Sequence, residues 1–233
     1  MKYRPGTRAR IISTTIEPPQ MPQLFDAASQ IRYASGYTSG AFGRQRMKLY
    51  TKAGDDGFTR RGDGRRLSKN DPLMQAVGAI DELDAHIGLC RQGAKKYEQE
   101  EIVEALATIQ TELYSVGSLL VGDKKTQQDA RSRRTSGELS RAVGRMERDI
   151  DAACRKLPQL TYFVSPGGCE PACRLHVART VCRRAERSFV AAAECTEVPP
   201  AVLQYLNRLS DLLFVLARLA NQIAGQEETL RQD

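Results

Sequence analysis

Apolar residues recur at intervals of three and four along most of the chain after residue 70. An α-helix has 3.6 residues per turn, so this spacing gathers them on one face of a helix. Five segments show the pattern, and five amphipathic helices with this spacing predict an all-α fold, a five-helix bundle. The five apolar series are Leu73, Ala76, Ile80, Leu83, Ile87 and Cys90; Ile102, Leu106, Ile109, Leu113, Val116 and Leu120; Leu139, Val143, Met146, Ile150, Ala153 and Leu157; Leu175, Ala178, Cys182, Ala185 and Phe189; and Leu206, Leu209, Leu213, Leu216 and Ala220.

Polar and turn-forming residues separate these series. Asn70 or Asp71 is a suitable N-cap for the first helix, and Pro72 suits a first turn. We expect the third helix to begin at Ser136-Gly137-Glu138, after a flexible basic connection over residues 122–137. Pro166-Gly167-Gly168 predicts the turn into the fourth helix, and Pro199-Pro200 precedes the fifth.

The fourth segment carries basic residues beside its apolar face. On a helical projection His176, Arg183 and Arg187 lie within about 80° of Arg179, next to the apolar sector. Guanidinium groups that converge at the edge of a core favour an anion, and a polyphosphate is the natural candidate. The alternative is a solvated basic face with an ordinary Glu–Arg pair.

Residues 47–69 lack the helical pattern and contain Gly54, Gly57, Gly62 and Gly64. A loop of this kind can bring backbone N–H groups against a ligand. It contains no Walker A motif, GxxxxGK[ST]. An ordinary glycine-rich surface loop is the alternative reading.

Basic charge is concentrated in two segments. Residues 1–46 hold seven Lys and Arg against two acidic residues, and residues 122–137 hold five against two. The rest of the chain is close to neutral, which argues against a nucleic-acid surface. No apolar run is long enough to span a membrane. Residues 1–46 are rich in Arg, Ser and Thr, which predicts a mitochondrial targeting segment and a matrix location; the alternative is a plain basic extension of a cytoplasmic protein.

The six cysteines do not form the framework of a small disulfide-rich domain, so we expect reduced, buried thiols in an intracellular protein. Cys169, Cys173 and His176 have a spacing found in metal sites, but the sequence offers no fourth ligand. We therefore predict no metal site built from these residues.

Several segments together carry a family resemblance. In chain order they are YTKAGDDGFT, SKNDP, AVGAIDELDAHIG, FVSPGG, LHVARTVCRRAER and YLNRLSDLLFVLAR. Over about residues 47–224 the chain resembles the trimeric, PduO-like ATP:cob(I)alamin adenosyltransferases, the family that includes the mitochondrial cobalamin adenosyltransferase of animals. It departs from the family's usual residues at Arg60-Arg61, at His86 and at Cys169.

The resemblance implies a homotrimer of five-helix bundles with active sites between subunits. It implies that cob(I)alamin attacks the 5′ carbon of MgATP, giving adenosylcobalamin and triphosphate. It further implies Asp81 and Arg179 as an ion pair on the cobalamin side, with Phe163 beneath the corrin ring. The ATP-binding residues it implies are Thr51, Lys52, Ala53, Gly54, Thr59, Arg60, Lys69, Arg183, Arg184, Glu186, Arg187 and Asn207.

The domain organisation expected is a basic extension over residues 1–46, an adenosyltransferase domain over 47–226 and a short tail over 227–233. A cobalamin reductase and methylmalonyl-CoA mutase, or another adenosylcobalamin enzyme, are the partners that the resemblance implies. The alternative function is a chaperone that carries adenosylcobalamin to a mutase without turnover. A loop and an arginine helix suited to ATP favour the enzyme.

Overall fold

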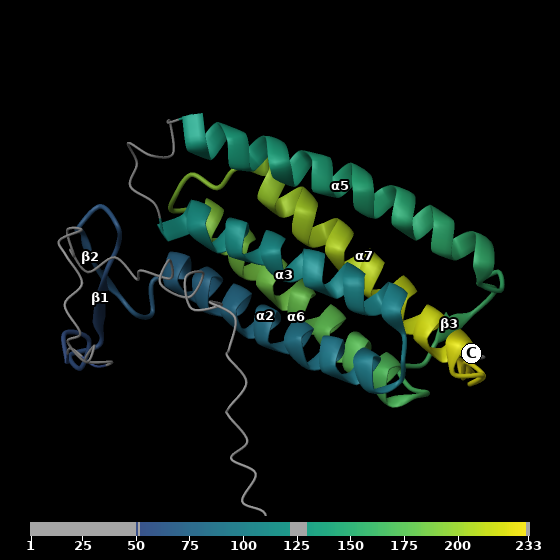
Figure 1. Cartoon of the computed structure of the whole chain (residues 1–233). Helices are drawn as coiled ribbons and strands as arrows, with labels where there is room; N and C mark the ends of the chain where they lie inside the picture. Colours follow the sequence, from purple (N-terminus) through teal and green to yellow (C-terminus); the bar gives the residue numbers. More distant parts are fainter. Residues whose placement is uncertain (1–49, 51, 122–129, 232–233) are drawn as a thin grey trace, which may run out of the picture. The chain divides into compact units, whose positions relative to one another are not determined.

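The computed structural model describes residues 50, 52–121 and 130–231. Within them lie five long helices: α2 (Pro72–Lys96), α3 (Glu100–Val121), α5 (Ala130–Lys156), α6 (Glu170–Ala193) and α7 (Pro200–Ile223). They run side by side as a bundle in which α2 packs on α3 and α6, and α7 packs on α6 and α5 (Figure 1). The predicted five-helix bundle is confirmed.

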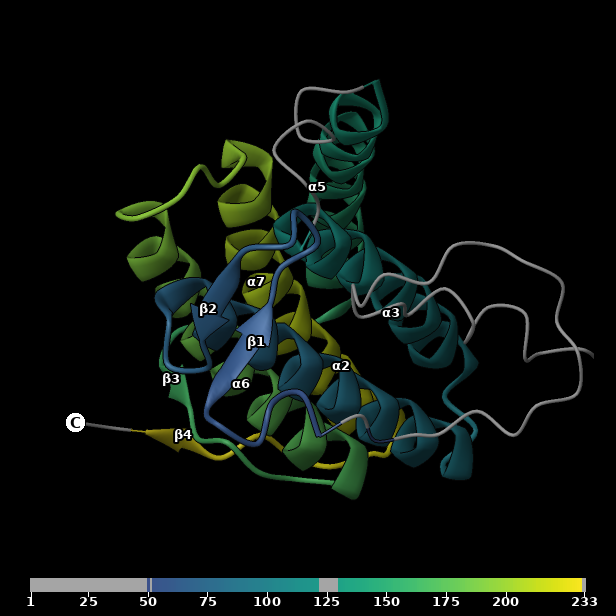
Figure 2. The same cartoon turned by 90° about the vertical axis from the view of Figure 1, so that its left-hand side faces the viewer.

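Most residues of the five apolar series form the core; Val143 and Ile150 are partly buried at its edge, and Ala153 and Leu157 form a smaller cluster with Val215. Leu83, Ile87, Leu106, Leu113 and Phe189 are among the largest side chains that are fully buried. Each such side chain stabilises the fold by about 1.5–3 kcal/mol through its removal from water. An end-on view shows α5 on the outside of the bundle (Figure 2).

The start of α2 follows the sequence prediction. Asp71 is the N-cap, and its carboxylate accepts a hydrogen bond from the Leu73 N–H at 2.9 Å. Pro72 occupies the first turn, where a missing N–H costs nothing because that group has no helical partner.

The predicted start of α5 is wrong. The helix begins at Ala130, so residues 130–137 of the expected flexible connection are helical. Arginine is a good helix former, and the Arg134 guanidinium pairs with Glu138 one turn later at 3.0 Å. These effects outweigh the weak helix propensity of Ser136 and Gly137. Residues 122–129 of that connection lie outside the described residues.

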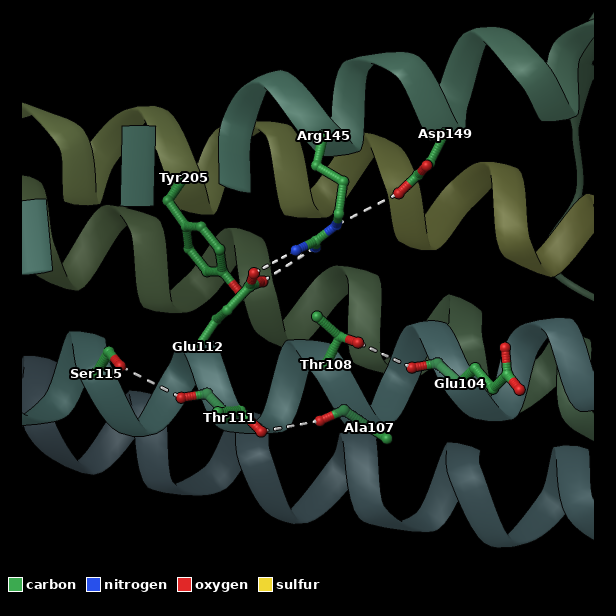
Figure 3. Close-up of polar contacts among 9 residues, drawn as sticks. All are labelled: Glu104, Ala107, Thr108, Thr111, Glu112, Ser115, Arg145, Asp149 and Tyr205. Carbon is green, nitrogen blue, oxygen red and sulfur yellow. Dashed lines mark hydrogen bonds and ion pairs between the residues drawn. The ribbon is translucent and has the colours of Figure 1, made fainter. Parts of the chain in front are cut away.

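A polar cluster fixes α5 against the bundle. The Glu112 carboxylate on α3 pairs with the Arg145 guanidinium on α5 and accepts a hydrogen bond from the Tyr205 hydroxyl on α7 at 3.1 Å (Figure 3). Burial, followed by the Glu112 charge, raises the pKa of Tyr205 well above its usual value. Three helices therefore meet at one partly buried carboxylate.

Among the described residues, four short strands lie outside the helices. β1 (Phe58–Arg60) and β2 (Arg66–Ser68) form an antiparallel hairpin, and β3 (Phe163–Val164) pairs antiparallel with β4 (Leu230–Arg231). The sequence predicted only a loop over residues 47–69, because strands of three residues are too short to show an alternating pattern.

All six cysteines are free thiols. Cys90 and Cys182 are buried, and burial raises the pKa of the Cys90 thiol to about 12. Cys154, Cys173 and Cys195 are exposed, so the expectation of buried thiols holds for only part of the set. Over the described ranges no helix is long and apolar enough to cross a membrane.

Candidate functional site

Helix α6 presents an exposed basic face beside its buried one. Leu175, Cys182 and Phe189 are fully buried, whereas Arg183 and Arg187 are exposed. In the part of the chain that the structure describes, neither guanidinium has an ion pair or a hydrogen bond. Two unpaired guanidinium groups one turn apart form a site suited to a multiply charged anion.

Two neighbours on the same helix are engaged within the chain. The Arg184 guanidinium pairs with Glu82 of α2 at 2.5 Å. The Asn207 amide of α7 donates to the Glu186 carboxylate at 3.0 Å. Arg184 therefore joins α2 to α6, while Glu186 and Asn207 form a fixed polar pair beside Arg183 and Arg187.

The glycine-rich segment closes into a compact turn ahead of the hairpin. The Gly57 N–H donates to the Gly54 carbonyl at 3.3 Å, and the Lys69 N–H donates to the Gly57 carbonyl at 2.9 Å. Lys52 and Gly57 have φ values of 60° and 82°, in the left-handed region. A Cβ at Gly54 would lie 3.1 Å from the Lys69 ammonium nitrogen, so the glycine leaves room for that side chain. The structure thus brings Lys69 to the loop.

The hairpin is tied by ionic contacts. Asp56 accepts from the Phe58 N–H and pairs with Arg66, and these contacts hold the pKa of Asp56 below its usual value. The Arg60 guanidinium donates to the Gly64 carbonyl at 3.4 Å. Arg60, a predicted ATP ligand, thus has a partner within the hairpin.

The remaining predicted loop residues are placed as follows. Lys52 and Ala53 are exposed and Thr59 is half-buried. Thr51 lies outside the described residues. Among the described side chains, no hydrogen bond or ion pair joins this loop to the α6 arginines. The two predicted parts of an ATP site therefore do not contact each other through such bonds within the described part of one chain.

A second candidate site lies on α6 one helical turn before Arg183. A pocket of about 600 Å³ is lined by Phe163 and Arg179 together with neighbouring side chains, among them Phe214 of α7. The other lining residues are Leu160, Thr161, Tyr162 and Val164. The Phe163 side chain is 81% exposed, which is unusual for so large an apolar group. The structure therefore places Phe163 and Arg179 at one pocket, and the roles that the resemblance implies for them stay predictions.

Asp81 is exposed on α2 and makes no ion pair with Arg179 within the described chain. The Arg179 Nε is buried without a hydrogen-bond partner among the described residues. The Asp81–Arg179 pair stays a prediction, one that a second copy of the chain would have to complete.

His176 corrects the helical projection, which placed it on the basic side. Its side chain is 4% exposed, and its ring centre lies 6.2 Å from that of Phe214. Neither ring nitrogen has a partner among the described residues. Burial, followed by the nearby Arg179 charge, lowers the pKa of His176. Its closeness to Arg179 in the sequence was the signal that it belongs near this pocket.

Comparisons with known proteins find relatives of this chain over most of its length. A family model described as cobalamin adenosyltransferase matches residues 49–220. A cobalamin adenosyltransferase of Cupriavidus metallidurans is 38% identical over 190 residues, covering 82% of this chain and 97% of that protein. The corrinoid adenosyltransferase MMAB of Bos taurus is 38% identical over 183 residues, covering 78% and 75%.

The fold has a close counterpart among solved structures. A variant PduO-type ATP:corrinoid adenosyltransferase from Lactobacillus reuteri, complexed with cobalamin and ATP, superposes with a TM-score of 0.73. It is 33% identical, and the match covers 80% of this chain and 97% of that one. The resemblance read from the sequence motifs is confirmed, and the chain belongs to the cobalamin adenosyltransferase family.

Proposed function

We propose that this chain transfers the 5′-deoxyadenosyl group of ATP to the cobalt of cob(I)alamin, forming adenosylcobalamin and releasing triphosphate. One observation carries the proposal. Helix α6 bears both an unpaired guanidinium face, at Arg183 and Arg187, and a wall of the apolar pocket, at Arg179. The family match and a structural relative complexed with both cobalamin and ATP support the pairing of these two ligands.

The reaction balances without proton transfer. The cobalt electron pair forms the Co–C bond, the bond between the 5′ carbon and oxygen breaks, and triphosphate leaves with that bond's electrons. The protein must therefore hold the two substrates in line and stabilise charge on the leaving group. Arg183, Arg187, Lys52 and Lys69 supply positive charge for this, and a general acid or base is not required.

Mg²⁺ enters as part of the substrate, MgATP. Among the described residues, no group of three His, Cys, Asp or Glu side chains could hold a metal ion. Mg²⁺ commonly keeps several waters and binds through substrate phosphates and one or two protein oxygens. We assign that role to the Glu186 carboxylate and the Asn207 amide, which are joined by a hydrogen bond of 3.0 Å.

On the cobalamin side, we assign Phe163 to the lower face of the corrin. An exposed aromatic ring at the rim of an apolar pocket can exclude water and the lower axial ligand from cobalt. Loss of that ligand makes reduction of cob(II)alamin to cob(I)alamin easier.

We infer further that each active site is shared between two chains of a homotrimer. Within the described part of one chain, no ion pair joins the loop to the α6 arginines, and none joins Asp81 to Arg179. Co-expression of Lys52→Ala and Arg183→Ala chains tests this. At an ATP concentration near the wild-type Kd, each variant alone should have low activity. Random co-assembly should restore about a quarter of all sites, one site in each mixed trimer, where both residues are intact. Mixed trimers without activity would contradict shared sites.

A direct assay distinguishes an enzyme from a chaperone that only carries adenosylcobalamin. ATP is added to the purified protein with chemically reduced cobalamin, and the loss of the Co(I) absorption is followed. The enzyme consumes cob(I)alamin only when ATP is present, whereas a carrier without turnover leaves the absorption unchanged.

The cellular setting is a proposal from the resemblance and from the basic residues 1–46, which lie outside the described residues. It comprises a mitochondrial matrix location, a cobalamin reductase as electron source and methylmalonyl-CoA mutase or another adenosylcobalamin enzyme as recipient. Removal of residues 1–40 should leave adenosyl transfer intact and abolish import. Normal localisation of the truncated protein would refute the targeting role.

A further inference from the structure

The last two turns of α7 bind the backbone of the segment that precedes α6. The Gln222 amide donates to the Lys156 carbonyl at 2.8 Å, and the Arg218 guanidinium donates to the Pro158 carbonyl at 2.8 Å. These bonds hold the start of the segment that carries Phe163.

Asn221 holds the other end of the same segment. Its amide donates to the Gly167 carbonyl at 3.0 Å and its oxygen accepts the Cys169 N–H at 2.9 Å. Gly168 has a φ of 104°, and a Cβ there would lie 2.0 Å from the Asn221 oxygen. Glycine is therefore required at this position.

The C-terminal residues close over this arrangement. The Glu228 carboxylate accepts three hydrogen bonds from the Arg218 guanidinium, at 2.8, 3.0 and 3.1 Å. The adjacent Thr229 carbonyl accepts the Ser165 N–H at 2.8 Å, and Leu230 pairs with Val164 in the β3–β4 ladder. Arg218 thus binds the Phe163 segment directly and holds the strand that pairs with it.

This ion pair is shielded from water. The Arg218 side chain is 3% exposed and that of Glu228 is 16% exposed. Loss of either partner leaves an uncompensated buried charge, so the pair strongly favours the arrangement in which Glu228 lies on Arg218. The neighbouring Glu227 is exposed and has no ion pair or hydrogen bond among the described side chains, so only one of the two adjacent carboxylates contacts Arg218.

The direction of Phe163 depends on this backbone. Its ring is 81% exposed, so packing against the chain's own core does little to fix it. We propose that Arg218 and Glu228 are positioning residues that hold β3 against β4 and so present Phe163 to the lower face of the corrin. The inference rests on the proposed function, and it extends the cobalamin side of the site to the C-terminal residues 228–231.

The test compares Glu228→Gln with Glu227→Gln in the full-length protein. Three quantities are measured on each: amide exchange at Ser165, the cob(II)alamin absorption and EPR spectra with ATP bound, and turnover from cob(II)alamin. Glu228→Gln should speed amide exchange at Ser165 and give the spectrum of five-coordinate cob(II)alamin, in which the lower ligand stays on cobalt. It should slow turnover by about 10- to 100-fold, the range typical of a misplaced supporting contact. Its apparent ATP affinity and the behaviour of Glu227→Gln should stay at the wild-type level.

A lower melting temperature with unchanged Ser165 exchange and an unchanged cob(II)alamin spectrum would show an ion pair that only stabilises the fold, and would overturn the proposal. If Glu228→Gln does not fold, Arg218→Lys retains the charge but loses the multiple contacts, and the same three measurements decide. Failure of the proposed function is distinguishable. It shows as no adenosyl transfer by the wild type from chemically reduced cobalamin, whereas Ser165 exchange tests the backbone contact without any substrate.

Discussion

Substitution of Arg183 by alanine isolates the proposed phosphate-binding face of α6. The guanidinium is exposed and has no ion pair or hydrogen bond within the described chain, so its removal costs little folding free energy. In the ATP complex the substitution removes a charge-assisted hydrogen bond to phosphate worth about 1.5–3 kcal/mol. At 1.4 kcal/mol per factor of ten, the Kd for ATP should rise about 10- to 150-fold.

The assay is isothermal titration of the variant with MgATP, together with a thermal melt. Arg148→Ala is the matched control, because Arg148 is also an exposed helical arginine and lies on α5. Lysine at position 183 should restore binding only in part, since an ammonium lacks the two-nitrogen fork of a guanidinium. An Arg183→Ala protein with the wild-type melting temperature and wild-type affinity for ATP would refute the assignment of this face.

Three other changes test separate parts of the molecule. Phe163→Ala should leave the melting temperature and ATP affinity near wild type, because the ring is exposed, but should slow turnover from cob(II)alamin by orders of magnitude; unchanged turnover and an unchanged cob(II)alamin spectrum would end that reading. The lowered pKa of His176 favours its neutral form in the folded state, so its contribution to stability is present above pH 6.5 and is lost as pH falls below it. Urea titrations at several pH values should show this loss of stability, and His176→Leu should remove the part of the loss that is due to His176. Glu112→Gln removes the charged partner of Arg145 and Tyr205 and should lower the free energy of unfolding by about 1.5–3 kcal/mol in the same titrations, while a change under 0.5 kcal/mol would show that the cluster contributes little.

The helices were predictable because each buries a regular apolar face. Positions such as Leu83, Leu106 and Phe189 recur at helical intervals, and burial of those side chains dominates the local energetics. The start of α5 was not predictable in the same way. Its first turns have no apolar face, and helix formation there depends on arginine propensity and on a surface ion pair.

Some residues of the candidate site were likewise predictable from the sequence and others were not. Arg183 and Arg187 were placed on the exposed face of α6 by periodicity alone, whereas Phe163 and Arg179 were assigned to the same side of the site only by the family resemblance. The burial of His176 was missed, because a projection of one helix contains no information about the segment that covers it. Arg218 and Glu228 were missed for the same reason, since they are ten residues apart in the sequence and are joined only by the reversal of the chain after α7.

The most direct test of the central claim counts products per protein. The purified chain is mixed with MgATP and a large excess of chemically reduced cobalamin, and adenosylcobalamin and triphosphate are quantified together. The account predicts many equivalents of adenosylcobalamin per chain and one intact triphosphate for each. Product that stops at or below one equivalent per chain, or ATP converted to diphosphate without adenosylcobalamin, would contradict it.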